Sequence, residues 1–306
     1  MSLYTRIKDF RIFNAKSIYK ISPLIISHHI DKELLLKFNN SVIKYLSKSA
    51  TCSYKLKNEK QLIDYYNLNQ KNLNFITPNG AVVPKKETSK EFNLITRNFV
   101  NIVKSLKINN YIIKFHIPLN IRIKFRKIPK SYYSRDRATE KPHSDSWAGE
   151  SSNCVNLHIP IFGDINNNKM EFYHPRKLDE KWLRPLKNFQ TGEKYIKYFK
   201  KVRFITKKGN LIISDFATLH KTVRKKNCNT RISLDTTFEL LRKNNNYARK
   251  IHSDRKNEYI SFKKFTKLGK NYKYDFKDSI FKTLKVDKGF KHFANYKLIN
   301  ERNKYK

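Results

Sequence analysis

Short segments in which apolar and polar residues alternate constrain the fold of this chain more than any other feature. Isoleucine or phenylalanine alternates with arginine or lysine over 121–126, and aliphatic residues alternate with asparagine and histidine over 155–159. Successive side chains of a strand point to opposite faces, so this period of two predicts half-buried strands. Further short strands are predicted at 169–173, 202–206, 210–214, 218–224 and 230–240, with polar turns between them. Closely spaced strands of this kind favour an antiparallel sandwich or barrel over β-α-β units.

The residues before 111 follow a helical period instead. Apolar residues recur three or four positions apart over 32–47 and again over 89–106, where Ser89 is a candidate N-cap. We therefore expect a mostly helical part over 1–110 that packs on a β-rich core over 111–244. The remaining residues, 245–306, form a basic C-terminal extension, and the 306 residues together are enough for one large compact domain.

The charge of the chain is strongly positive, with 66 Lys and Arg residues against 25 Asp and Glu residues, a net charge of +41. Proteins that bind nucleic acid concentrate such charge in a stripe or a tail, whereas here lysines are spread from Lys8 to Lys306. AT-rich coding is an alternative source of so many lysines. We therefore expect a small-molecule partner, with an anionic one favoured by the charge, and leave polyanion binding by the C-terminal extension as a lesser option. The sequence does not predict an oligomeric state.

Membrane insertion and disulfide bonding find no support in the sequence. No apolar run approaches the roughly 18 residues that span a bilayer, and the start MSLYTRIKDF lacks the features of a signal peptide. The three cysteines are far apart and odd in number, which argues against a disulfide framework and a CxxC zinc site. A soluble cytoplasmic protein is the expectation.

Three polar residues in the β-rich part form a candidate metal site. His143 and Asp145 stand two positions apart in KPHSDSWAGE, so on an extended segment their side chains point the same way. His220 lies on a later predicted strand and can complete one face of an octahedron around an ion. This face leaves three positions open, which is the arrangement used for non-heme Fe(II) oxygen chemistry.

A candidate carboxylate clamp follows the last histidine. The turn at 225–229 folds the next strand back, which brings Arg231 and Ser233 near His220. The arginine fork suits a carboxylate, and the serine on the same strand face adds a hydroxyl donor. A metal face with such a clamp beside it is what a 2-oxo diacid needs.

The pattern HxD…H followed eleven residues later by Arg resembles the Fe(II)/2-oxoglutarate-dependent dioxygenases. The resemblance is closest to their phytanoyl-CoA dioxygenase branch and to the related oxygenases of streptomycin-type antibiotic biosynthesis. The stretches VNLHIPIFGD, GNLIISDFATLHKT and NTRISLD support it, and it covers about residues 111–240. The FYHP segment departs from the Pro-Gly-Ser-His turn that is common in that branch.

This resemblance implies a double-stranded β-helix, a cupin-like jelly roll, with a helical N-terminal part. It also implies that His143, Asp145 and His220 hold Fe(II), that Arg231 and Ser233 bind the distal carboxylate of 2-oxoglutarate, and that O2 takes the remaining position. The implied reaction releases succinate and CO2 and hydroxylates or desaturates a small polar metabolite, such as a sugar, an aminocyclitol, or an acyl or phosphorylated intermediate. Related halogenases lack a carboxylate at the position of Asp145, so halogenation is disfavoured.

Several further residues are candidates for the same pocket. Asn156, if it points inward, is expected to touch the cosubstrate. Arg122, Tyr133, Trp147 and Asp235 are candidates for the mouth of the pocket and for contact with the substrate, and a packing or surface role is the alternative for each.

Three other interpretations remain open at this point. The metal triad could serve only for hydrogen bonding, or the fold could be a Zn or Mn cupin that binds metal or isomerises a substrate without 2-oxoglutarate, although such a protein does not need Arg231 and Ser233. The basic charge also suggests a nucleic-acid-directed demethylase of the same superfamily. Its typical Arg and Asn pattern downstream of the last histidine is not found here.

Overall fold

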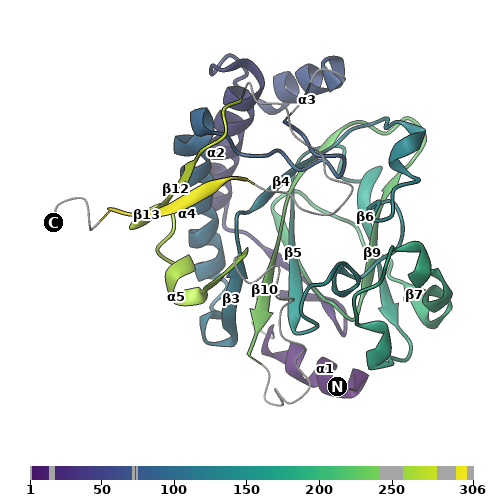
Figure 1. Ribbon diagram of the computed structural model, residues 1–306. Helices are drawn as coiled ribbons and strands as arrows, with labels where there is room; N and C mark the ends of the chain where they lie inside the picture. Colours follow the sequence, from purple (N-terminus) through teal and green to yellow (C-terminus); the bar gives the residue numbers. More distant parts are fainter. Residues whose placement is uncertain are drawn as a thin grey trace.

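Two antiparallel sheets face each other in this protein, and helices cover the outer side of the larger sheet (Figure 1). The computed structural model describes residues 2–13, 18–70, 73, 75–241, 258–280 and 294–301. Within this part the chain is mainly β with flanking helices and has the two-sheet arrangement of a jelly roll, as the sequence predicts.

The larger sheet has the strand order β1-β2-β8-β5-β10-β3-β11, and β4 pairs with the other half of β10. The smaller sheet has the order β7-β6-β9, and β12 and β13 form a separate hairpin. The strands are β1 Ile18–Ser22, β2 Ile25–His29, β3 Ile112–His116, β4 Asn120–Lys124, β5 Cys154–Gly163, β6 Asn168–Pro175, β7 Phe199–Lys201, β8 Asn210–Asp215, β9 Leu219–Arg224, β10 Arg231–Leu240, β11 Tyr259–Ser261, β12 Tyr272–Phe276 and β13 Tyr296–Asn300.

The larger sheet is covered on both faces. Ile232 and Leu234 of β10 are fully buried in the main hydrophobic core, together with Ile121 and Ile123 of β4. The alternate residues of β10 point to the opposite face, which looks toward the smaller sheet. Strand alternation therefore separates an apolar face under the helices from a polar face between the sheets.

The helices that cover the apolar face are the ones that the sequence predicts. They are α2 (Lys32–Thr51) and α4 (Ser89–Ser105), which pack against each other and contribute their apolar stripes to the main core. Helix α2 begins where the Asp31 side chain accepts hydrogen bonds from two backbone N–H groups. The predicted cap Ser89 is wrong by one position, because Thr88 is the N-cap of α4 and Ser89 is its first helical residue. The other helices are α1 (Leu3–Phe10), α3 (Glu59–Leu68) and α5 (Phe262–Phe265).

Some predicted elements differ from the structure. The first hundred residues contain the strands β1 and β2, which extend the larger sheet through the pairing of β2 with β8. The residues of β2 are buried on both faces except His29, so they show no alternation that would have predicted a strand. The strand predicted at 202–206 is absent, and the nearest strand, β7, comes just before it.

The described parts of the C-terminal extension pack on the core. The ring of Phe265 stacks on that of Phe115 with 3.8 Å between the centroids, and Phe276 meets Phe92 of α4 edge to face at 5.2 Å. The Asn93 side chain bonds both the N–H and the carbonyl of Tyr274. These contacts make the described extension part of the hydrophobic core, while residues 242–257, 281–293 and 302–306 lie outside the described residues.

None of the described helices combines the length and the apolar character that crossing a bilayer requires.

Candidate metal centre

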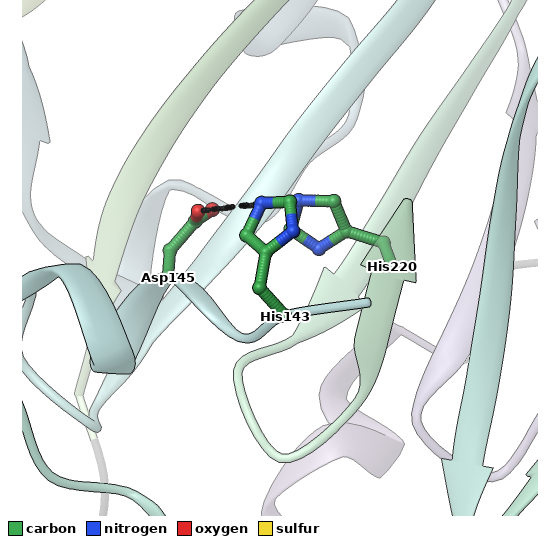
Figure 2. Close-up of side chains that lie close together, drawn as sticks. All are labelled: His143, Asp145 and His220. Carbon is green, nitrogen blue, oxygen red and sulfur yellow. Dashed lines mark ion pairs between the residues drawn. The ribbon is translucent and has the colours of Figure 1, made fainter. Parts of the chain in front are cut away.

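His143, Asp145 and His220 meet between the two sheets (Figure 2). The backbone places the histidines, because the N–H of His143 donates to the carbonyl of His220 at 3.0 Å and the reverse bond measures 2.8 Å. His220 belongs to β9, where its strand partner is Phe172 of β6. Asp145 begins a short 3-10 helix, Asp145–Ala148, rather than continuing the extended segment that the sequence predicts.

The ligand atoms of the three side chains converge. Nε2 of His143 lies 3.8 Å from Oδ1 of Asp145, and Nε2 of His220 lies 3.9 Å from the same oxygen. The two imidazole rings are 4.3 Å apart between their centroids, and Figure 2 shows both facing the carboxylate. These separations leave room for one ion among two nitrogen atoms and one oxygen atom.

The surroundings of His143 favour the form that binds metals. Its Nδ1 lies 2.7 Å from the carbonyl of Lys141 and donates to it, so the lone pair is on Nε2. The ring stacks on Phe189, with 4.2 Å between the centroids. Burial, together with the neighbouring His220, lowers the pKa of His143 to about 3, so the imidazole is neutral at physiological pH.

Asp145 supplies the negative charge of the group. Burial would raise the pKa of this carboxyl, but His220 and His143 and a hydrogen bond from Asn156 together hold the pKa below its usual range. Its side chain remains 27% exposed, so this side of the group is open. Two imidazole nitrogen atoms and one ionised carboxylate on one side of an open position suit Fe(II), and Zn(II) accepts the same ligand types.

Arg231 lies at the start of β10 on the face between the sheets and is only 1% exposed. Its Nε has no hydrogen-bond partner, and no carboxylate of the described residues forms an ion pair with the guanidinium. Burial lowers the pKa of Arg231 to about 10, which keeps it charged, while Asp235 acts in the opposite direction. A buried guanidinium with donors to spare fits the carboxylate of a bound ligand.

The neighbouring residues on β10 and β5 are already paired. Ser233 is fully buried and its hydroxyl lies 3.4 Å from Oδ2 of Asp235. Asp235 accepts a 2.6 Å hydrogen bond from Nδ1 of His158 and forms a 3.1 Å ion pair with Arg122. The structure uses this carboxylate to hold Arg122 and His158 in place, and contact of Asp235 with the substrate stays a prediction.

Asn156 points inward, as the prediction for it requires. Its side chain lies within hydrogen-bonding reach of Asp145 and of Thr237, its strand partner on β10. In this structure Asn156 therefore orients a candidate metal ligand, and contact with a cosubstrate stays a prediction.

Trp147 lies away from the mouth that the sequence assigns to it. It is 1% exposed, its Nε1 donates to the carbonyl of Trp182 at 2.6 Å, and it belongs to a second cluster with Trp182, Phe189, Phe199 and Leu219. The prediction of a substrate contact is corrected, because this indole packs in the interior of the protein. Tyr133, by contrast, is 46% exposed at the end of a 3-10 turn.

Asp215 has a structural role some way from the ligands. It is fully buried and forms an ion pair with Arg6 of α1, with 2.7 Å between Nη2 and Oδ1.

Sequence reasoning missed Lys124. The alternation of β4 places it on the polar side of this strand, and Lys124 is only 4% exposed. Its Nζ donates to Oγ1 of Thr139 at 2.6 Å, and Glu140 and Arg224 lie beside it. One sequence signal pointed to it, because alternation puts Lys124 on the strand face of Arg122, whereas its burial depends on the smaller sheet, which covers this face.

A second group of ligand atoms lies at the β3–β11 edge of the larger sheet. His116, Glu150 and Glu258 bring such atoms within 4.8 Å of one another. Each is taken by a protein partner, since Nε2 of His116 pairs with Glu258 at 3.2 Å and Glu150 accepts from the hydroxyl of Tyr259. The His143 group is therefore the better candidate for a metal centre.

Comparisons with known proteins give general structural similarities. No protein-family profile and no curated protein sequence matches the chain. The chain is similar to the non-heme alpha ketoglutarate dependent carbocyclase SnoK from nogalamycin biosynthesis, at 9% identity over 78% of this chain and 84% of that one, with a TM-score of 0.42. It is also similar to the epimerase SnoN from the same biosynthesis (9% identity, 69% and 76% covered, TM-score 0.37). A third similar structure is an N-substituted L-amino acid dioxygenase from Burkholderia ambifaria in complex with alpha-KG (11% identity, 76% and 90% covered, TM-score 0.35).

Proposed function

We propose that this protein is an Fe(II)- and 2-oxoglutarate-dependent oxygenase. His143, Asp145 and His220 would hold the iron, and Arg231, with Ser233 beside it, would hold the distal carboxylate of 2-oxoglutarate. With both groups bound, such a site supplies oxidation by O2 coupled to the release of succinate and CO2. The observation that carries the proposal is Arg231 of β10, a buried cation that forms no ion pair with any carboxylate of the described residues.

The arrangement of charges favours this function over a metal-binding cupin without a cosubstrate. A buried charge that no partner compensates costs several kcal/mol, so a fold that only binds metal has no reason to retain Arg231 in this state. The neighbouring Asp235 already pairs with His158 and Arg122, so it is not a counter-ion for Arg231 alone. A carboxylate from a ligand would satisfy Arg231.

The protein groups around the triad hold its ligand side chains in place. The hydrogen bond from Nδ1 of His143 to Lys141 and the stack on Phe189 fix one ring, and Asn156 fixes the carboxylate of Asp145. Phe189 also excludes water from one side of His143. The exposed part of Asp145 marks the open side, which we assign to a small polar substrate that is hydroxylated or desaturated.

Binding measurements test this proposal without knowledge of the substrate. Isothermal titration calorimetry with Mn(II), a redox-stable substitute for Fe(II), and then with 2-oxoglutarate separates the metal site from the clamp. We expect Asp145→Ala to lose metal binding. Arg231→Lys should keep metal binding and weaken 2-oxoglutarate binding at least tenfold, because an ammonium does not reproduce the two-pronged geometry.

Arg126→Lys is the matched control, because Arg126 is an exposed arginine two residues beyond the end of β4. It should bind both ligands as the wild type does. Wild-type protein that binds Mn(II) but not 2-oxoglutarate would refute the proposal and favour a cupin that binds metal alone. Succinate release by the Fe(II) protein, with and without candidate substrates, then measures turnover.

A further inference from the structure

Lys124 and Arg231 are neighbours across two paired strands. In the antiparallel pair of β4 and β10, Lys124 is the register partner of Arg231, and Arg122 is the partner of Ser233. Side chains directly opposite each other in such a pair share one face and have Cβ atoms about 4.5–5.5 Å apart. Both are buried, with 4% of Lys124 and 1% of Arg231 exposed.

The buried charges around this pair do not balance. Four cations, Lys124, Arg122, Arg224 and Arg231, surround two carboxylates, which are Asp235, paired with Arg122, and Glu140. Nη1 of Arg224 lies 3.0 Å from Oε1 of Glu140, whereas Nζ of Lys124 lies 3.9 Å from the same oxygen. With every group ionised, this cluster carries two uncompensated positive charges inside the protein, and the charge of a dianion would offset both.

The environment of Lys124 disfavours its charged form. Burial lowers the pKa of Lys124 to about 7; Glu140 opposes this shift, and Arg122, Arg224 and Arg231 add to it. Its Nζ bonds Thr139, whose carbonyl accepts from the N–H of Thr222 on β9, the strand of His220, so the lysine faces the smaller sheet that carries this ligand.

We infer that Lys124 binds the distal carboxylate of the cosubstrate together with Arg231. This inference rests on the proposed function and adds a residue that the sequence pattern does not assign. Arg231 presents its planar fork and Lys124 a point charge. An ammonium has three N–H donors, and Thr139 takes one of them, so donors remain for a ligand.

The competing interpretation is that Lys124 only compensates Glu140, whose Oε2 has no hydrogen-bond partner among the described residues. Two ligands separate these roles. 2-Oxobutyrate has the 2-oxo acid end of 2-oxoglutarate but no distal carboxylate, so a residue that acts on that carboxylate affects only the diacid.

The experiment measures the Kd of both ligands by calorimetry on the full-length Mn(II) protein without turnover. We expect Lys124→Met to raise the Kd of 2-oxoglutarate at least tenfold and to leave those of 2-oxobutyrate and Mn(II) within twofold. Lys124→Gln, which keeps a donor for Thr139, should give the same result and serves if the methionine variant folds poorly. Lys114→Met is the control, because Lys114 is exposed on β3, which also pairs with β10.

The outcomes distinguish this inference from the proposed function. An unchanged Kd of 2-oxoglutarate in both Lys124 variants, or an equal loss for both ligands, overturns the role of Lys124 and leaves the oxygenase proposal intact. Wild-type protein that does not bind 2-oxoglutarate overturns both. Selective loss for the diacid supports both.

Discussion

The buried ammonium of Lys124 predicts a stability that depends on pH. Burial lowers its pKa to about 7, whereas a lysine in an unfolded chain has a pKa of about 10.4. Between these values the unfolded chain binds one more proton than the folded protein. The free energy of unfolding therefore rises with pH in this window, by up to about 1.4 kcal/mol per pH unit, and does not depend on this group below pH 7.

Substitution of Lys124 removes this dependence. From pH 7.5 to pH 9, Lys124 should add about 2 kcal/mol to the stability of the metal-free wild type, because its penalty for being charged in the folded state is relieved. Lys124→Met has no group to deprotonate there. The difference in stability between variant and wild type should thus change by about 2 kcal/mol over this range, while other titrating groups cancel in the difference.

Urea unfolding followed by tryptophan fluorescence measures this difference at pH 6, 7.5 and 9. The signal is suitable because both tryptophans, Trp147 and Trp182, are buried in the folded protein. The control Lys114→Met should run parallel to the wild type at every pH. Parallel curves for the wild type and Lys124→Met between pH 7.5 and 9 would show that Lys124 is not a desolvated cation.

Three further predictions concern buried contacts: two of side-chain packing and one ion pair. Phe265→Ala should lower the free energy of unfolding by about 3–5 kcal/mol in urea, because the ring is fully buried, and should leave Mn(II) binding intact; a loss below 1 kcal/mol would contradict the packing of the C-terminal extension. Asp215→Asn should cost about 3–5 kcal/mol in the same assay, since it removes the charge of a carboxylate that pairs with the buried guanidinium of Arg6, and an unchanged urea midpoint would be against it. Gly192→Ala should cost about 1–3 kcal/mol and shift the tryptophan emission, because a Cβ there would come 2.1 Å from the Trp147 ring; unaltered emission would argue against this contact.

Much of the architecture follows from local patterns in the sequence. The apolar stripes of α2 and α4 and the alternation of β4, β5 and β10 predict these elements because helix and strand periods are properties of short segments. The same alternation puts Arg231 and Ser233 on one strand face. The spacing of His143 and Asp145 predicts two ligands for one ion, and the structure brings them together with His220, although Asp145 does so from a 3-10 helix.

The tertiary structure alone decided what covers each face. Alternation predicts that Arg122 and Lys124 share a face, but the smaller sheet, formed from residues 168–224, is what buries that face. The register of β10 against β4 and β5 decided that Asp235 is occupied by Arg122 and His158. Likewise the C-terminal aromatics and Trp147 became core because distant segments meet there. The physical reason is that side-chain periodicity is local, whereas burial and pairing depend on contacts between strands and helices far apart in the chain.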